Sequence, residues 1–154
     1  MTTATALTQD TIGAKIYEIA EVSRSASRIL ARADSATKNR ALNIAAQAIR
    51  TETGSIADAN AADIAYAEEK GIDAALRDRL LLTSERIEMM ASSLEEMALL
   101  SDPVGQLQQE WDRPNGLKIA RITVPLGVIG IIYESRPNVT VDAGGLCLKS
   151  GNAA

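Results

Sequence analysis

The sequence predicts an α/β fold in which a mainly helical leader precedes a single β-loop-α unit. Apolar residues recur at helical spacing through most of residues 11–100, and the composition turns polar after Pro103. A continuous apolar run, Leu126–Tyr133, then precedes another helix-compatible stretch. We therefore divide the chain into a mainly helical part (1–103), a loop with an edge strand (104–125), and a first parallel strand, loop and helix (126–154).

The composition excludes several classes of protein. The 154 residues carry 16 Lys and Arg against 20 Asp and Glu, a formal charge of -4, without a long run of either sign. This balance argues against a nucleic-acid or anionic-membrane surface, because both need clustered basic residues. No stretch reaches the roughly 18 apolar residues of a membrane span, and the N-terminus lacks a signal-peptide pattern. We therefore expect a soluble, cytoplasmic protein.

Cys147 is the single cysteine, and the chain has no histidine. It therefore cannot build a disulfide framework, a zinc site or a Ser-His-Asp triad, and we expect no metal site. Cys147 stands in a helix-compatible stretch, where it is interpreted as a buried small hydrophobe, with a nucleophile as the alternative. Lys149, near the end of the same stretch, suits the negative end of a helix dipole.

The leader begins with three predicted helices. The first is amphipathic and spans Thr11 to about Arg32, with apolar residues three and four positions apart. The second follows Asp34, a favourable N-cap residue, and closes at Gly54. The third, Ser55–Lys70, is rich in alanine and glutamate, which favour helix formation.

Two further helices complete the leader. A short helical segment follows Asp73, and the next helix starts at Thr83, which is predicted to cap it. Asp102–Pro103 ends that helix, because proline restricts the residue before it and cannot continue the hydrogen bonding. Its apolar face is predicted to pack in the core and consists of Ile87, Met90, Leu94 and Met97.

The last third of the chain carries the predicted strands. Val104–Arg113 is polar and is expected to be a loop, whereas Leu117–Val124 alternates apolar and polar residues as a half-exposed edge strand does. Leu126–Tyr133 is expected to be a parallel strand buried on both faces, and Val139–Lys149 the helix after it. Because such a strand needs neighbours on both edges and no further strands follow, we expect a truncated domain.

The loop after the second strand is the candidate site, because ligands of α/β sheets bind beyond the carboxyl ends of the strands. The strand glycines, Gly127 and Gly130, precede this loop and do not have the GxGxxG spacing of a phosphate-binding fingerprint. Their structural interpretation is close backbone packing inside a sheet. The sequence therefore directs attention to the side chains of the loop itself.

Two loop residues have side chains suited to recognition. The guanidinium of Arg136 can pair with a phosphate or carboxylate, and the amide of Asn138 can donate to a developing oxyanion. Each also has a structural alternative. Asn138 could be the N-cap of the following helix, and Arg136 could form an ion pair with Glu134 or with a neighbouring helix.

The stretch Val124–Asp142, continued by Leu146–Ala153, resembles the γ-glutamyl phosphate reductases (glutamate-5-semialdehyde dehydrogenases) of the aldehyde dehydrogenase superfamily. Ala59–Asp63, Leu76–Thr83 and Ser101–Gly105 resemble the same family in the same order. The resemblance covers nearly the whole chain except the first ten or so residues. Family members are much longer, so the chain is expected to be an N-terminal fragment of one.

The resemblance implies an aldehyde-dehydrogenase-type, Rossmann-like NADP-binding domain, of which this chain holds the N-terminal part and from which the catalytic cysteine domain is absent. It also implies NADPH-dependent reduction of L-glutamate 5-phosphate to L-glutamate 5-semialdehyde with release of phosphate, the second step of proline biosynthesis. A cysteine outside this chain is the implied nucleophile. The fragment alone is expected to be inactive, and the intact enzyme is compatible with a homo-oligomer.

The resemblance also assigns roles to the loop. Ser135–Asn138 stands where ordinary aldehyde dehydrogenases have a Trp-Asn-Phe-Pro element beside the nicotinamide. By this resemblance, Asn138 is the oxyanion donor and Arg136 meets the phosphate or carboxylate of the substrate. The residues implied to line the nicotinamide side of the cofactor site are Ile132, Tyr133, Glu134, Ser135, Arg136 and Pro137.

Two alternative functions stay open. A general aldehyde dehydrogenase is disfavoured by the Ser-Arg-Pro-Asn sequence of the loop at 135–138. The other alternative is a non-catalytic helical interaction module, derived from the reductase, that pairs with intact subunits through the Leu117–Val124 strand. This second alternative is motivated by the strand's exposed edge, which needs a covering partner or promotes association.

Overall fold

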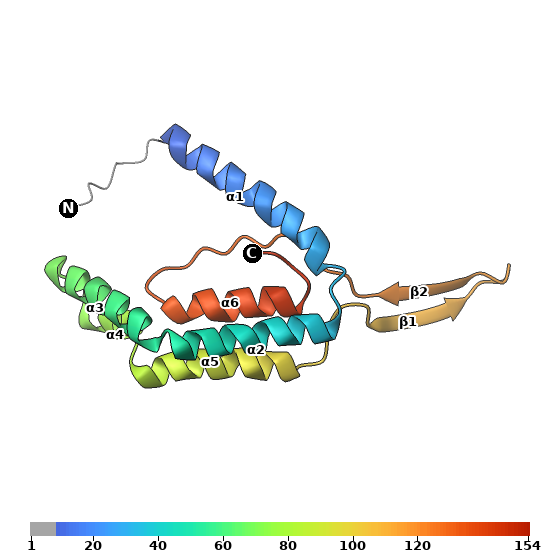
Figure 1. Cartoon of the computed structure of the whole chain (residues 1–154). Helices are drawn as coiled ribbons and strands as arrows, with labels where there is room; N and C mark the ends of the chain where they lie inside the picture. The colour runs from blue at the N-terminus through green and yellow to red at the C-terminus, as the bar shows by residue number, and fades with distance from the viewer. Residues whose placement is uncertain (1–8) are drawn as a thin grey trace.

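A computed structural model describes residues 9–154, and it is mostly helical with one short sheet (Figure 1). Its helices are α1 (Gln9–Leu30), α2 (Ser35–Thr51), α3 (Thr53–Glu69), α4 (Ala74–Leu80), α5 (Ser84–Leu99) and α6 (Pro137–Lys149). Its strands are β1 (Leu107–Asp112) and β2 (Lys118–Ile122). The predicted α/β class is confirmed. No helix among these residues is long and apolar enough to cross a membrane.

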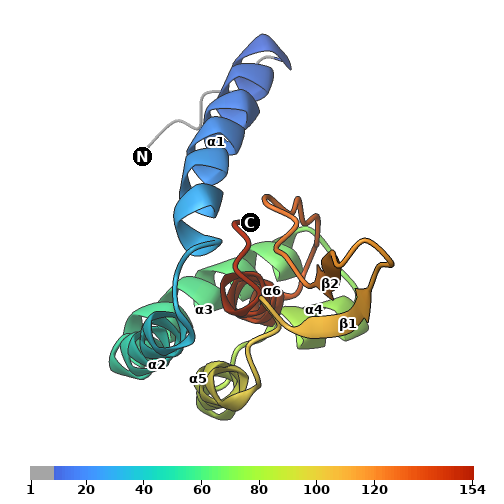
Figure 2. The same cartoon turned by 90° about the vertical axis from the view of Figure 1, so that its right-hand side faces the viewer.

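The core lies where α2, α5 and α6 run side by side, seen end-on in Figure 2. Small and aliphatic side chains fill it, which agrees with a chain that lacks phenylalanine. The predicted apolar face of the helix behind Thr83 is confirmed, because all four of its residues are buried. The central buried cluster consists of Leu42, Ala46, Ala91, Leu94, Met97 and Ala98.

Gly145 allows α6 to lie close against α5. A Cβ atom built on Gly145 would stand 2.7 Å from both Leu94 Cδ2 and Met97 Sδ, whereas one built on the neighbouring Gly144 would meet nothing within 4 Å. The two positions thus share a helix but differ in the space around them. A side chain at 145 has to displace buried core atoms, which a side chain at 144 does not.

We expect Gly145→Val to be about 2 kcal/mol less stable than Gly144→Val, because both variants carry the same helix-propensity cost and only the first overfills the core. Urea unfolding followed by helical circular dichroism measures the difference. Equal stabilities for the two variants would show that α5 and α6 can separate at no cost, contrary to this packing.

Local capping positions the helix starts. Asp34 Oδ1 accepts a hydrogen bond from Thr37 N at 2.7 Å, and Thr83 Oγ1 accepts one from Arg86 N at 3.2 Å, so both predicted caps are confirmed. The predicted end of the second helix is wrong by a few residues. α2 ends at Thr51, and Gly54 lies inside α3, because only Glu52 separates the two helices.

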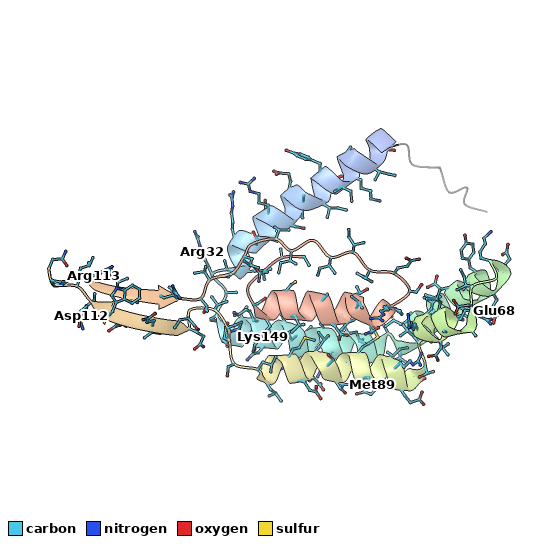
Figure 3. The ribbon with its side chains drawn as sticks, turned by 180° about the vertical axis from the view of Figure 1, so that it is seen from behind. Arg32, Glu68, Met89, Asp112, Arg113 and Lys149 are labelled. Carbon is cyan, nitrogen blue, oxygen red and sulfur yellow. The ribbon has the colours of Figure 1, made fainter. Side chains whose placement is uncertain are left out.

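Two lysines are buried beside the core. Lys38 Nζ lies 2.6 Å from Asp102 Oδ2, and the Lys38 side chain is 2% exposed. Lys149, labelled in Figure 3, is also 2% exposed and donates to Asn39 Oδ1 at 2.6 Å and to the carbonyl of Ala98 at 3.0 Å. The prediction that Lys149 merely complements the helix dipole is therefore incomplete, since its ammonium ties α6 to α2 and α5.

The first helix is confirmed but contributes little to the core. α1 leans away from the other helices in both views (Figures 1 and 2). Most of its large apolar residues are exposed. The sequence periodicity indicates that the helix is amphipathic, but it does not indicate which surface covers the apolar face. The large apolar residues of α1 exposed in this way are Ile12, Ile16, Tyr17, Ile19, Val22 and Ile29.

The prediction of a loop over Val104–Arg113 is wrong for most of its length. β1 forms there and pairs antiparallel with β2, with Glu110 opposite Ala120 and Trp111 opposite Ile119. Backbone pairing with the alternating strand β2 overrides the polar composition of β1. The hairpin projects from the helices, with Asp112 and Arg113 near its tip (Figure 3), and β2 has no second strand partner among residues 9–154.

The predicted strand Leu126–Tyr133 is wrong as a buried element. It forms one isolated parallel bridge, Val128 to Ala153, with Ala153 N donating to the Gly127 carbonyl at 2.9 Å. Leu126 is 87% exposed and Ile132 is 102% exposed. The parallel orientation is present, but within the described residues only the Ala153 segment pairs with this stretch.

The interpretation of the two glycines as close packing points is also wrong. A Cβ atom on Gly127 or on Gly130 would meet nothing within 4 Å. Gly127 is instead required by its backbone, because its φ of 115° lies in a region that side-chain-bearing residues rarely adopt. It turns the chain toward Asn152, whose side-chain oxygen accepts from Gly127 N at 2.8 Å.

We expect the 154-residue chain by itself to bind a dye specific for apolar surface and to be poorly soluble, because the apolar faces of α1 and of residues 126–132 are both exposed. Dye fluorescence measured alongside helical circular dichroism tests this. A chain that unfolds in one sharp transition and binds no dye would contradict the exposed surfaces.

Candidate functional site

The loop of the candidate site leads directly into α6. Ser135 has a φ of 51°, and Pro137 is the first residue of the helix, a position that suits proline because no N–H is needed there. Arg136 is thus the N-cap residue, without a side-chain capping bond. The alternative that Asn138 caps the helix is wrong, since it lies in the first turn.

A pocket with a volume of about 480 Å³ opens between the α4–α5 corner and the first turn of α6. Apolar side chains of the corner and of α5, Leu81, Leu82, Met89 and Met90, form part of its lining. Its volume falls in the range of roughly 300–1,000 Å³ typical of small-molecule sites. The charged and amide residues that line it are Asp78, Arg79, Arg86, Arg136, Asn138 and Asp142.

Only some of the charges in this pocket are paired with each other. Arg86 Nη2 lies 3.1 Å from Asp78 Oδ1, and Arg86 Nη1 donates to the Leu81 carbonyl at 2.9 Å. Arg79 and Arg136 form no ion pair with an acid among residues 11–154, whose side chains the structure describes. The alternative that Arg136 pairs with Glu134 or with a neighbouring helix is therefore wrong.

Asp142 is held by neutral groups. Ser93 Oγ donates to its Oδ1 at 3.0 Å, and Asn138 Nδ2 donates to its Oδ2 at 3.0 Å. No lysine or arginine of the described residues forms an ion pair with this carboxylate. These hydrogen bonds orient the carboxylate from α5 and α6 but leave its charge without a counter-ion.

Asn60 on α3 fixes the wall formed by the α4–α5 corner. Its side chain is 4% exposed, donates to the Leu80 carbonyl at 2.8 Å and accepts from Leu82 N at 2.7 Å. These two bonds satisfy backbone groups on either side of Leu81, where α4 has ended and α5 has not begun. The Asn60 side chain therefore replaces the helical hydrogen bonds that these two backbone groups lack between α4 and α5.

The structure brings together only part of the predicted site. Arg136 and Asn138 line the pocket, whereas Ile132, Tyr133, Glu134, Ser135 and Pro137 do not. Tyr133 instead forms a hydrogen bond through its hydroxyl with Thr140 Oγ1. Sequence reasoning missed Arg79 and Asp142 as pocket residues. Both lie in segments that carry the family resemblance, but periodicity could not indicate that α4 and α6 line the same pocket.

Cys147 is not part of this pocket. It is 6% exposed on α6, and burial raises the pKa of its thiol. A raised pKa disfavours the thiolate, which is the nucleophilic form. The interpretation of Cys147 as a buried small hydrophobe on a helix is confirmed.

Comparison with known proteins identifies relatives of the whole chain. It is 56% identical over 147 residues to the gamma-glutamyl phosphate reductase of Paramagnetospirillum magneticum, covering 96% of this chain and 35% of that protein. It is 54% identical over 154 residues to the reductase of Rhodospirillum rubrum, covering 100% of this chain and 36% of the relative. No protein-family model matches the chain.

Solved structures agree. The Thermotoga maritima gamma-glutamyl phosphate reductase superimposes with a TM-score of 0.86 at 44% identity over 88% of this chain and 33% of that one. The Saccharomyces cerevisiae reductase gives a TM-score of 0.84 at 34% identity over 89% of this chain and 35% of that one. The chain matches the N-terminal part of gamma-glutamyl phosphate reductases. The predicted resemblance to this reductase family is confirmed, and the chain spans about a third of its relatives' length.

Proposed function

We propose that this chain is the leading part of an enzyme that reduces L-glutamate 5-phosphate to L-glutamate 5-semialdehyde with NADPH and releases phosphate, the second step of proline biosynthesis. The observation that carries the proposal is the pocket, whose lining includes Arg136 and Asn138 from the loop that resembles the reductases. The 56% identity to one reductase supports the same activity. A cytoplasmic location and a homo-oligomeric intact enzyme belong to the same proposal.

The loop before α6 fits one wall of a nicotinamide site. Ile132 is 102% exposed and Tyr133 is 44% exposed, so both offer apolar surface on which a flat ring can lie. Glu134, Ser135, Arg136 and Pro137 continue this wall to the N-terminus of α6. NADPH, when bound there, supplies the hydride that replaces the thiolate at a thioester carbon.

Asn138 is proposed to stabilise the oxyanion of the reaction. A cysteine thiolate outside these 154 residues forms a thioester as the acyl C–O bond breaks, and phosphate leaves with that electron pair. One Asn138 Nδ2–H is committed to Asp142, but the amide has a second N–H for the carbonyl oxygen. The 154-residue chain alone is accordingly expected to be inactive.

A chimera tests the proposal. In it, this chain replaces the matched segment of the P. magneticum reductase, and NADPH formation is followed with glutamate 5-semialdehyde, phosphate and NADP. We expect a rate within about tenfold of the parent enzyme, a difference of roughly 1.4 kcal/mol in the barrier. A folded chimera that turns over nothing, beside an active parent, would contradict the proposed function.

One specific observation favours the alternative of a non-catalytic interaction module. β2 is mostly exposed and has no second partner strand among residues 9–154, so its free edge can accept a strand. A stable complex between this chain and the intact reductase in native mass spectrometry, lost when Ala120→Pro disrupts β2, would favour the module. Absence of that complex together with an active chimera would favour the enzyme.

A further inference from the structure

The pocket combines two unpaired positive charges with one unpaired negative charge. Arg79, in the last turn of α4, and Arg136, before α6, have no acid partner among the described residues. Asp142, which lines the same pocket, accepts hydrogen bonds only from the neutral side chains of Ser93 and Asn138. The remaining ion pair, Arg86 with Asp78, is internally balanced. A net excess of positive charge here stands out in a chain with a formal charge of -4.

This charge pattern selects among ligands. Guanidinium groups bind carboxylate and phosphate through paired N–H donors, and a carboxylate without a counter-ion suits an ammonium group. A ligand with two negative charges and no positive charge would place a like charge near Asp142. A neutral acyl group would leave the charges of Arg79, Arg136 and Asp142 without a ligand partner. The complementary ligand carries two anionic groups and one cationic group, which is the pattern of an acyl-phosphate derivative of an acidic α-amino acid.

We infer that this pocket recognises the α-amino-acid end of the substrate, with Asp142 binding the α-ammonium and Arg79 the α-carboxylate. Arg136 is then left for the acyl phosphate, because it lies beside Asn138 and the loop of the reacting end. The assignment rests on the proposed function and deepens it. Arg79 and Asp142 become specificity-determining residues that neither the loop motif nor periodicity had indicated.

The position of Asp142 suits this role. Its two oxygens accept from Ser93 and from Asn138, so the carboxylate is oriented by α5 and by the first turn of its own helix. Carboxylate oxygens have further acceptor capacity beyond these bonds, which leaves room for an ammonium donor. The shared bond with Asn138 also links recognition of the ammonium to the residue proposed to stabilise the oxyanion.

Two aldehydes test the assignment in the chimera: L-glutamate 5-semialdehyde and 5-oxopentanoate, which lacks the ammonium group. We expect Asp142→Asn to lower kcat/KM for the semialdehyde about 10- to 100-fold more than kcat/KM for 5-oxopentanoate, which has no ammonium group to lose. Arg79→Gln is expected to raise KM for both aldehydes, since both keep a carboxylate, without changing KM for phosphate. Arg136→Gln is expected to raise KM for phosphate.

Matched controls lie on the exposed hairpin, where Asp112→Asn and Arg121→Gln make the same chemical changes and should leave all three parameters unchanged. An Asp142→Asn enzyme in which the ratio of kcat/KM for the semialdehyde to kcat/KM for 5-oxopentanoate is unchanged would overturn the inference, while an active chimera leaves the proposed function standing.

Calorimetric titration decides the inference without turnover. L-glutamate should bind the chimera about 10- to 100-fold more weakly after Asp142→Asn, whereas glutarate should not distinguish the two proteins. If the folded chimera is inactive, this result still supports or overturns the ligand assignment. Equal weakening of L-glutamate and glutarate would overturn it.

Discussion

Lys38→Met is expected to destabilise the helical core by about 3 kcal/mol at neutral pH, the lower end of the range for breaking a buried ion pair from one side. The Lys38 ammonium lies 2.6 Å from Asp102 Oδ2, with side chains 2% and 19% exposed. Removing the lysine leaves the Asp102 carboxylate in a mostly buried position without its closest counter-ion. Urea unfolding followed by circular dichroism measures the loss.

The same pair makes stability depend on pH. Burial tends to raise the pKa of Asp102, but hydrogen bonds from Lys38 and from Val104 N outweigh it, so the pKa is lowered. A carboxyl group whose pKa is lower in the folded state stabilises fully above its unfolded pKa, about 3.9, and loses this contribution as pH falls through the folded value. The difference between the native chain and Lys38→Met should therefore shrink below about pH 4.

Lys118→Met is the matched control, because Lys118 is exposed on β2 and has no ion pair among the described residues. It should change the free energy of unfolding by less than about 0.5 kcal/mol. If Lys38→Met were as stable as Lys118→Met at neutral pH, the buried pair would not be a net support of the core.

Asn60→Leu is the second large effect, with an expected loss of about 2–4 kcal/mol. The substitution leaves the Leu80 carbonyl and the Leu82 N–H without their partners at 2.8 and 2.7 Å, in a place where water has little access. Because Leu82 lines the pocket, the wall should loosen as stability falls. Hydrogen exchange at the Leu82 amide should accelerate more than exchange at amides in the middle of α2.

Asn115→Leu provides the comparison for this variant. Asn115 Oδ1 accepts from Leu117 N at 3.1 Å, so it makes the same kind of bond in an exposed turn of the hairpin. Water can replace that bond, and the expected loss is under about 1 kcal/mol. Similar losses for the two asparagines would contradict a special role for Asn60 in the pocket wall.

What the sequence could predict depended on the range of the interactions involved. The caps at Asp34 and Thr83 were predictable because a side chain bonds to an N–H three residues away. The apolar face containing Leu94 and Met97 was predictable because helical periodicity records which side is buried. In both cases the determining information lies within a few turns of chain.

Strands and pocket walls depended on distant partners. β1 was missed because its polar residues show no alternation, and only its pairing with β2 makes it a strand. Leu126–Tyr133 has the composition of a buried strand but pairs only at Val128 within the described residues. An apolar run indicates that a segment favours a buried strand. A sheet forms only where a neighbouring segment also satisfies the backbone N–H and C=O groups.

In the candidate site too, residues of one local motif could be predicted and residues brought together from distant segments could not. Arg136 and Asn138 were found because one loop motif contains both, and both line the pocket. Arg79 and Asp142 come from helices more than sixty residues apart in the sequence. Their relation emerges only when α5 brings the α4–α5 corner against α6, which no local pattern of one sequence encodes.

The single buried thiol, Cys147, provides a native probe of how often the core opens. Cys147 is 6% exposed on α6, so a thiol reagent reaches it only when that helix separates from its neighbours. With no other cysteine to remove, the rate of modification in the native sequence reports the frequency of that opening. Substitutions that weaken the packing of α6 can therefore be ranked by the rate at which a thiol reagent modifies Cys147, without any introduced label.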